Sequence, residues 1–173
     1  MYGFVLLLPF LLIRFGLLVR LDREAVSRAA YFAPVRGGER TAYWVYQISS
    51  AGILLAPFFL KVSAMFSWQM VLGLICYVGG LCLCAASIAG FAAPDAAGLN
   101  TNGIYRISRN PMYGSYFICF MGMALLTRSW ILFGLTAVFQ ISAHWIILAE
   151  ERWCLEKFGE PYERYMKTVR RYI

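Results

Sequence analysis

The sequence has few charged residues for its length. It holds 16 basic and 9 acidic residues, which is 14% of its 173 positions. A soluble domain averages roughly 25% charged residues, so about 43 would be expected. This deficit leaves too little polar surface for a water-soluble domain, and it also excludes a disordered chain, which depends on dense charge. The composition therefore predicts an integral membrane protein.

The sequence also lacks a cysteine pattern that would form a disulfide framework or a metal site. Its five cysteines are odd in number, contain no C-x-x-C spacing, and lie mostly in apolar runs. Paired or clustered cysteines are the usual signature of either kind of site. We interpret these residues as reduced, small hydrophobic side chains and expect no metal site.

Long apolar runs, in contrast, are abundant. A helix needs roughly 20 mainly apolar residues to cross the hydrocarbon core of a membrane. The sequence therefore predicts an all-α, polytopic membrane protein with about five transmembrane helices and a C-terminal cytosolic helical segment. No repeat or linker divides the chain, so we expect one domain over residues 1–173, with three helices in 1–91 and a polar loop, a helical hairpin and a tail in 92–173. The five expected spans are residues 2–19, 42–60, 68–91, 112–126 and 130–149.

The first apolar run is expected to remain as a helix. It has no basic residues before it and no clear small-residue cleavage site after it, so it is unlike a signal peptide. Arg14 lies inside this run. A cation in a membrane helix is costly unless its head reaches the interface or faces the helix bundle.

Basic residues gather in alternate connections between the apolar runs. Residues 20–41 hold five Lys or Arg, residues 92–111 hold two, and the tail from residue 150 holds six, whereas the other two connections hold one each. The positive-inside rule then predicts an outside N-terminus and a cytosolic C-terminus. The net charge of +7 is accounted for by anionic lipid headgroups, so we expect membrane lipids as partners and no nucleic acid.

The polar segment 91–114 is rich in turn-forming residues. Asn102 and Gly103 predict a turn. Asn110 precedes Pro111, which disfavours a helical conformation at residue 110 and suits residue 111 to the first turn of the next helix. A cationic loop that leads into a helix N-terminus favours binding of a carboxylate or another anion.

The last apolar run continues without a helix breaker into Glu150 and Glu151. We expect this helix to end at Gly159, and a second helix to place Tyr162 and Tyr165 one turn apart, with Val169 next on the same face. An alternative is that this second helix lies on an anionic lipid surface.

Glu150 and Glu151 are adjacent, so they face different directions and are not expected to act as a paired acid and base. Glu151 shares a helix face with His144, two turns earlier. We interpret His144 as a hydrogen-bonded packing residue rather than a catalytic one. An acid that points into the bundle would bind a cation or hydroxyl groups.

Two segments together resemble a known superfamily. Residues 103–113, GIYRISRNPMY, are similar to the G-x-Y-x-x-x-R-[HN]-P-x-Y stretch of the isoprenylcysteine carboxyl methyltransferase and phospholipid methyltransferase superfamily. The superfamily's C-terminal ending is resembled by Glu150-Glu151, Leu155, Phe158-Gly159, Tyr162, Tyr165, Val169 and Arg171. The resemblance implies an integral membrane methyltransferase that uses S-adenosylmethionine at the cytosolic membrane face and takes a lipophilic acceptor from the bilayer.

Site residues carried over from the resemblance fall in both segments. The residues implied to bind the cofactor are Gly103, Tyr105, Arg109, Asn110, Pro111, Tyr113, Glu150 and Tyr162. The implied catalytic residues are Glu150, Glu151 and Arg109. Arg109 or the helix N-terminus would hold the cofactor's carboxylate, a glutamate its ammonium or ribose, and the tyrosines its adenine or sulfonium.

Several functions remain open at this point. The resemblance implies a prenylcysteine-type carboxylate as the acceptor, but a phospholipid amine or a small lipophilic thiol is also compatible with the sequence. A different class is a non-enzymatic membrane protein that binds the cofactor without turnover. Neither the oligomeric state nor the glutamate that contacts the cofactor follows from the sequence.

Overall fold

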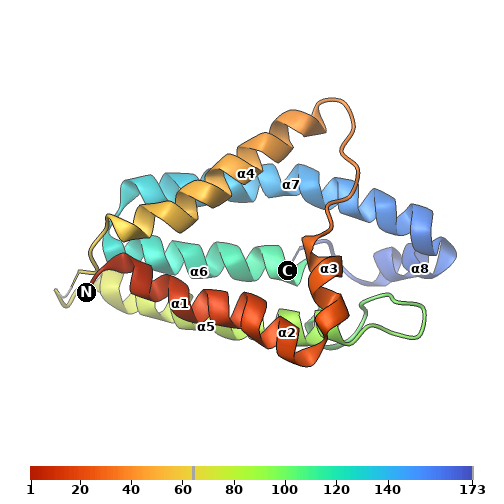
Figure 1. The fold of residues 1–173 in the computed structure, drawn as a ribbon, viewed down its shortest axis with the longest axis horizontal. Coiled ribbons are helices and arrows are strands. Elements are labelled where there is room, and N and C mark those ends of the chain that lie inside the picture. Colours follow the sequence, from red (N-terminus) through yellow and green to blue (C-terminus); the bar gives the residue numbers. More distant parts are fainter. Residues whose placement is uncertain (64, 173) are drawn as a thin grey trace.

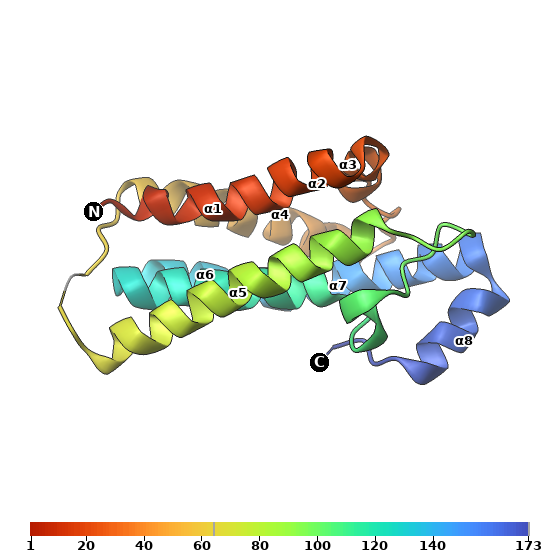
Figure 2. The same cartoon turned by 90° about the horizontal axis from the view of Figure 1, so that it is seen from below.

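The computed structural model describes residues 1–63 and 65–172 of the chain. Regular structure in this part consists of helices, with two isolated β-bridges, and the long helices run side by side as a bundle (Figure 1). The N-terminus lies at one end of the bundle, and α8 (Glu160–Thr168) lies at the other (Figure 2). The all-helical fold class that the composition predicts is confirmed.

The first apolar run forms one continuous helical stretch, Gly3–Leu21. It begins with a 3-10 turn and continues through α1 (Leu7–Leu11), a π-helical segment (Leu12–Leu17) and α2 (Leu18–Leu21). Arg14 lies in the π-helical segment. Wide turns of this kind are rare and are frequently found at functional sites.

The connection after α2 contains a helix that the sequence pattern did not predict. α3 (Arg23–Ala30) turns away from α2 across the end of the bundle (Figure 1). The carboxylate of Asp22 accepts a hydrogen bond from the backbone N–H of Glu24 and so caps the helix. The helix is short and largely polar, so it carries no apolar run, and residues 20–41 were expected to be a loop.

The remaining helices are close to those that the sequence predicts. They are α4 (Glu39–Leu55), α5 (Trp68–Ala92), α6 (Pro111–Thr127), α7 (Trp130–Phe158) and α8 (Glu160–Thr168). α4 begins three residues before the expected start, and a 3-10 turn (Ala56–Phe58) replaces its expected end. Val169 lies beyond α8 in extended backbone, so the expectation that it continues this helix is wrong.

Local signals explain where these helices begin and end. The Ser67 and Ser129 hydroxyls cap α5 and α7, and Pro111 lies in the first turn of α6. Gly159 ends α7 with a φ of +61°, a conformation that favours glycine because it has no Cβ. α7 therefore extends well beyond Glu150, as predicted.

Three helical stretches are long and apolar enough to cross a membrane by length and composition. They are Gly3–Leu21, Trp68–Ala92 and Trp130–Phe158. α4 and α6 are shorter, at 17 residues each. By this criterion the described part of the chain has three candidate spans rather than the five that we expected.

Helix packing is closest between α5 and α6, where glycine is required. A Cβ atom on Gly80 would overlap the backbone of Cys119, and one on Gly122 would overlap the backbone of Tyr77. Small residues allow helices in membranes to approach closely enough for extensive van der Waals contact. This contact holds α5 and α6 together, and α4 packs along α7 on the other side of the bundle (Figure 1).

An aromatic cluster joins the first helix to the rest of the bundle. The ring of Phe10 packs edge-on against Tyr116 and Phe120, at centroid distances of 5.3 and 4.9 Å. Phe139 of α7 lies between Phe120 and Tyr46 of α4, at 5.8 and 4.9 Å. Four segments of the chain thus share one apolar core, and the bundle opens beyond it toward α8.

Candidate functional site

A cavity of about 460 Å³ lies at the end of the bundle that carries α8. Its walls come from the first helix, the segment from α3 onward, α4, residues 98–116, the end of α7, and α8. This volume lies in the range of small-molecule binding sites, which are mostly apolar with a few convergent polar groups. The cavity therefore combines residues from distant parts of the chain.

Most of the site residues implied by the resemblance line this cavity. The lining includes Tyr105, Arg109, Asn110, Tyr113, Glu150, Glu151 and Tyr162. Gly103 and Pro111 are not in the lining, and their contribution is to the backbone. Gly103 begins a 3-10 turn with a φ of +57°, and Pro111 begins α6. Both shape the segment that carries Tyr105 and Arg109.

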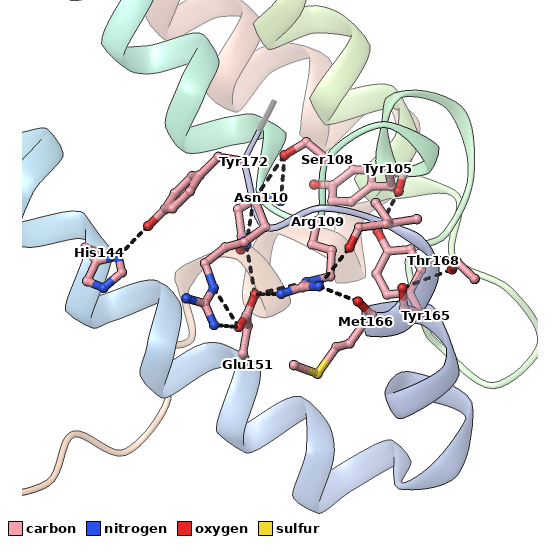
Figure 3. A network of polar contacts seen from close by, with 12 residues as sticks. Tyr105, Ser108, Arg109, Asn110, His144, Glu151, Tyr165, Met166, Thr168 and Tyr172 are labelled. Carbon is pink, nitrogen blue, oxygen red and sulfur yellow. Dashed lines mark hydrogen bonds and ion pairs between the residues drawn. The ribbon is translucent and has the colours of Figure 1, made fainter.

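Glu151 is the centre of a buried ion-pair network (Figure 3). Its Oε1 accepts hydrogen bonds from Arg109 Nε at 3.0 Å and Nη2 at 2.8 Å, and its Oε2 pairs with Arg171 Nη2 at 2.8 Å. The side chains of Glu151 and Arg109 are only 4% and 7% exposed. Buried charges of this kind require full pairing, because removal of one partner leaves the other uncompensated. Both oxygens of Glu151 are therefore engaged within the protein.

Arg109 also holds the segment that follows α8. Its Nη1 donates to the carbonyl oxygens of Met166 and Val169, at 2.9 and 2.8 Å, and its backbone N–H donates to Arg170. A guanidinium has five N–H groups, and four of those of Arg109 are used in this way and on Glu151. We call Arg109, Glu151 and Arg171 the C-terminal clamp. It joins the segment before α6 to the end of α7 and to the last residues of the chain.

The apolar face of α8 is covered by the protein itself. Tyr162 and Tyr165 are buried against Leu99 and Phe158, and the Tyr165 hydroxyl donates to the Tyr105 carbonyl oxygen at 2.6 Å. Burial raises the pKa of Tyr165 to about 12, so this hydroxyl stays a neutral donor near neutral pH. The apolar face of α8 therefore packs against the protein and is not the face that could contact a lipid surface.

Glu150 has a different environment from its neighbour. Its Oε1 accepts a hydrogen bond from the Tyr113 hydroxyl at 2.8 Å. Its Oε2 has no hydrogen-bond partner among residues 1–63 and 65–172, and the side chain lines the cavity. Adjacent residues on a helix point about 100° apart, which places Glu150 and Glu151 on different sides of α7. Glu150 is the one of the two with a free oxygen.

Aromatic rings make up much of the remaining cavity wall. Tyr46 of α4 lies edge-on to Tyr113, with 6.3 Å between ring centroids, and Tyr116 lies one turn further along α6. Trp153 lines the end of the cavity on α7, where the ammonium of Lys157 lies 4.6 Å from its ring centroid. Aromatic faces attract cations and stack on planar groups. Tyr46, Tyr116 and Trp153 could not be recognised as site residues from the sequence, because aromatic residues are ordinary in apolar helices.

Two cavity-lining side chains carry buried polar atoms without a partner in the described part of the chain. These atoms are Nη1 of Arg14 and Oδ1 of Asn100. A buried polar group without a hydrogen bond costs free energy, so such atoms mark positions where a ligand group can bind. The sequence indicated that Arg14 was costly, but it did not connect that residue with the site.

His144 lies outside the cavity lining. Its Nδ1 is 2.6 Å from the Tyr172 hydroxyl, and this pair is exposed (Figure 3). The contact fits the interpretation of His144 as a hydrogen-bonded packing residue. Among residues 1–63 and 65–172, no three His, Cys, Asp or Glu side chains are grouped as metal ligands.

The segment between α3 and α4 is tied to α7 at the edge of the cavity. The Arg152 guanidinium makes two hydrogen bonds of 2.8 Å to the Glu39 carboxylate and donates to the Pro34 carbonyl oxygen at 3.1 Å. The hydrogen bond from Arg152 lowers the pKa of Glu39 to about 2. This ion pair holds Phe32 and Ala33 in the cavity wall.

The fold and the site define a class of protein. Apolar helices of membrane-spanning length end at a charged, aromatic cavity, which is the arrangement of an integral membrane protein with a candidate binding site at one end of its bundle. The model of one family, phospholipid methyltransferase, matches residues 68–161, more than half of the chain. The protein belongs to the phospholipid methyltransferase family and so to the membrane methyltransferases, which confirms the resemblance drawn from the two segments. The comparisons with curated proteins and with solved structures gave no match.

Proposed function

We propose that the protein transfers a methyl group from S-adenosylmethionine to a lipophilic acceptor. The proposal rests on one observation: a free carboxylate oxygen of Glu150 and several aromatic side chains line the same cavity, which extends to the first apolar helix. Family membership supports methyl transfer as the reaction class. The acceptor nucleophile, a prenylcysteine-type carboxylate, a phospholipid amine or a lipophilic thiol, is to be identified by assay.

The chemistry of the cavity fits S-adenosylmethionine group by group. Glu150 Oε2 is placed to take the ammonium or the ribose hydroxyls, and the orphan Oδ1 of Asn100 suits an N–H donor such as the adenine amine. Tyr46 and Tyr113 offer faces for the sulfonium or the adenine ring. We assign the carboxylate of the cofactor to Lys157, a cation that lines the cavity on α7. Most N–H groups of the Arg109 guanidinium already donate to protein oxygens. When bound, this cofactor supplies a methyl group that is already activated for transfer.

The protein's own residues then have to align the reactants and exclude water. The C-terminal clamp and the Tyr165 hydrogen bond fix the segment that carries Tyr105 and Arg109. The Glu39–Arg152 ion pair holds the segment that covers the cavity edge. A carboxylate acceptor needs no base. An amine acceptor must be deprotonated before it attacks, because the one free oxygen of Glu150 is assigned to the donor. Arg109 and Glu151 are positioning residues in this proposal.

We also propose that all five long helical segments cross the membrane as one domain, with the N-terminus outside and the cavity at the cytosolic face. At 17 residues, α4 and α6 reach about 25 Å, slightly less than the roughly 30 Å hydrocarbon core. The 3-10 turn after α4 and local thinning of the bilayer accommodate the difference. The basic connections at the α8 end support this orientation.

Calorimetric titration of the purified protein with S-adenosylmethionine tests the central claim. We expect saturable binding, and we expect Glu150→Gln to weaken it by about tenfold or more, because a charge-assisted hydrogen bond is lost. Glu163→Gln, on the exposed surface of α8, should change the affinity less than about twofold. A folded wild-type sample that does not bind would overturn the proposal.

A labelled-methyl transfer assay with native lipid and metabolite extract then separates the enzyme from the alternative of a binding protein. Transfer to an extractable amphiphile, followed by identification of the product, establishes the acceptor class. Saturable binding without transfer to any component of the extract would favour the non-enzymatic alternative.

A further inference from the structure

Arg14 differs from the other arginines that line the cavity. Arg28 and Arg109 pair with Asp22 and Glu151 at 3.0 and 2.8 Å. Arg14 makes no ion pair with any carboxylate among the described residues. Among the described residues, its guanidinium makes one hydrogen bond, a long contact of 3.4 Å from Nη2 to the Ala29 carbonyl oxygen, and Nη1 is buried without a partner.

The surroundings of Arg14 stabilise a cation but leave its hydrogen bonds unmade. The guanidinium carbon lies 5.5 Å from the ring centroid of Phe15 and 5.7 Å from that of Tyr116. Cation–π attraction offsets part of the desolvation cost, yet the rings accept none of the strong hydrogen bonds that a guanidinium donates. The unsatisfied donors face a cavity, so a bound anionic group would complete them.

The position of Arg14 along its helix identifies the kind of molecule that can reach it. Arg14 lies seven residues before the end of the Gly3–Leu21 stretch, which is roughly 10 Å along the helix axis. It also lies in the irregular π-helical segment, between apolar residues. An ionisable residue at such a depth in an apolar helix marks a functional position by default. A ligand that brings an anion there has to enter among apolar side chains, which suits an amphiphile.

Arg14 also lies outside the part of the chain that matches the family, residues 68–161. The methyl donor is the reactant that all methyltransferases of one family share, so its binding groups are expected within that matching part. Glu150 and Lys157, the groups proposed above for the donor, are both inside it. The first helix is therefore free to serve the other reactant.

We propose that Arg14 binds an oxyanion of the amphiphilic acceptor, a phosphodiester or a carboxylate set apart from the methylated atom. This inference rests on the proposed function, because it assigns one wall of the same cavity to the acceptor. The guanidinium of Arg14 can donate two parallel hydrogen bonds to the two oxygens of either group. The acceptor then lies in the cavity between Arg14 and Glu150, with its anionic group bound at the Arg14 end.

The test uses three ligands and three variants of the full chain, purified in dodecyl maltoside. The ligands are dodecylphosphoethanolamine, which has a phosphodiester, dodecanoyl-glycine, which has a carboxylate, and dodecylamine, which has neither. The variants are Arg14→Met, Arg14→Lys, and Arg20→Met as the control at an exposed position of the same helix. Binding is measured by calorimetry, with S-adenosylhomocysteine as a separate probe of the donor side.

We expect wild type to bind at least one of the two amphiphiles that carry an oxyanion, the zwitterionic phosphoethanolamine or the glycine carboxylate, more tightly than dodecylamine. Arg14→Met should weaken the affinity for that ligand by about tenfold or more, and Arg14→Lys should restore part of the lost affinity. Arg20→Met should change the affinity less than about twofold. Binding of S-adenosylhomocysteine should be unchanged in all three. The amphiphile whose binding weakens in Arg14→Met shows whether Arg14 binds a phosphodiester or a carboxylate.

Three results would overturn the inference. In the first, wild type does not distinguish the two amphiphiles that carry an oxyanion from dodecylamine. In the second, Arg14→Met weakens the binding of S-adenosylhomocysteine instead, which would show that Arg14 binds the carboxylate of the methyl donor. In the third, Arg14→Met leaves the protein folded by its thermal unfolding curve but binds every ligand as wild type does. Failure of wild type to bind S-adenosylhomocysteine at all would count against the proposed function, not against the amphiphile site.

Discussion

The two ends of the helix bundle are held together by different forces. Toward the turn between α6 and α7, α5 and α6 pack through glycines, and Gly73, Gly80 and Gly122 each face a neighbouring helix at close range. The ion pairs of the described residues lie toward α8, and those of Arg28, Arg109 and Glu151 line the cavity there. Close van der Waals packing fixes the first end, whereas paired charges hold the segments that enclose the second.

This difference separates stability from function in one small protein. Tight packing of small residues needs no polar groups and is suited to the membrane interior. A cavity at that end would cost contacts that the bundle needs. At the α8 end, charged pairs can hold irregular segments around an open volume, since a carboxylate such as Glu151 accepts several hydrogen bonds from different segments at once. Changes at each end should therefore have distinct effects.

The largest effect is expected from Glu151→Gln. The substitution leaves Arg109 buried with an uncompensated charge, and breaking a buried ion pair of this kind typically costs about 3–5 kcal/mol. We expect the residues after α8 to detach, with rapid proteolysis there and loss of S-adenosylmethionine binding. Thermal unfolding and limited proteolysis in detergent measure both.

The matched control for this variant is Glu160→Gln on α8. Its ion pair with Arg164 is 76% and 69% exposed, so its loss should cost less than about 1 kcal/mol. If Glu151→Gln behaved like this control, the clamp would have no part in holding the cavity end together.

A somewhat smaller effect is expected from Gly80→Val at the close-packed end. The new Cβ would overlap the backbone of Cys119, which cannot move away without shifting α6. Overpacking of this kind costs about 3 kcal/mol at the upper end of its usual range. The unfolding temperature of the variant in detergent should fall, and its size-exclusion profile should broaden.

Gly79→Val provides the comparison, because a Cβ at Gly79 has no neighbouring atom within 4 Å. This variant should unfold at nearly the wild-type temperature. Equal destabilisation by the two substitutions would show that helix propensity, not the contact between α5 and α6, sets their effect.

The smallest effect concerns the pH dependence of the segment between α3 and α4. The pKa of Glu39 is lowered to about 2 by Arg152, against roughly 4.3 in an unfolded chain. The stabilisation from this pair is therefore fully present above about pH 4.3 and is lost as the pH falls toward 2. Hydrogen exchange of residues 31–38 should thus be slower, after correction for intrinsic rates, at pH 6 than at pH 3.

Glu39→Gln should remove most of this pH difference, while Glu24→Gln on exposed α3 should retain it. A pH difference that persists in Glu39→Gln would assign the effect to another group. The change is expected to be small because Glu39 and Arg152 are partly exposed and solvent screens their interaction.

Much of the helical architecture could be predicted from the sequence because its signals are local. Apolar runs, the Pro111 helix start and the Gly159 stop act over a few neighbouring residues, and they placed α5 to α8 within a few positions. α3 was not predicted because its Asp22 cap precedes a short polar stretch with no apolar run. The membrane-span count differed because α4 and α6 are helical but short.

The candidate site could be predicted only where a motif carried it. Seven of the nine residues implied by the resemblance line the cavity, all from residues 105–162. Tyr46 and Arg14 belong to the same cavity but lie far away in sequence. Tyr46 is an ordinary aromatic residue of an apolar helix, and Arg14 was noticeable in its apolar run but had no local link to the site. Their contribution depends on which helices pack side by side, which no single segment encodes.

The sequence alone determined that the protein is helical, that it belongs in a membrane and that its charges concentrate near one set of connections. It could not distinguish Glu150 from Glu151, because two adjacent identical residues have the same local context. The tertiary structure decided this. Glu151 points to two arginines that close off both of its oxygens, whereas Glu150, turned by about 100° on the helix, faces the cavity with one oxygen free.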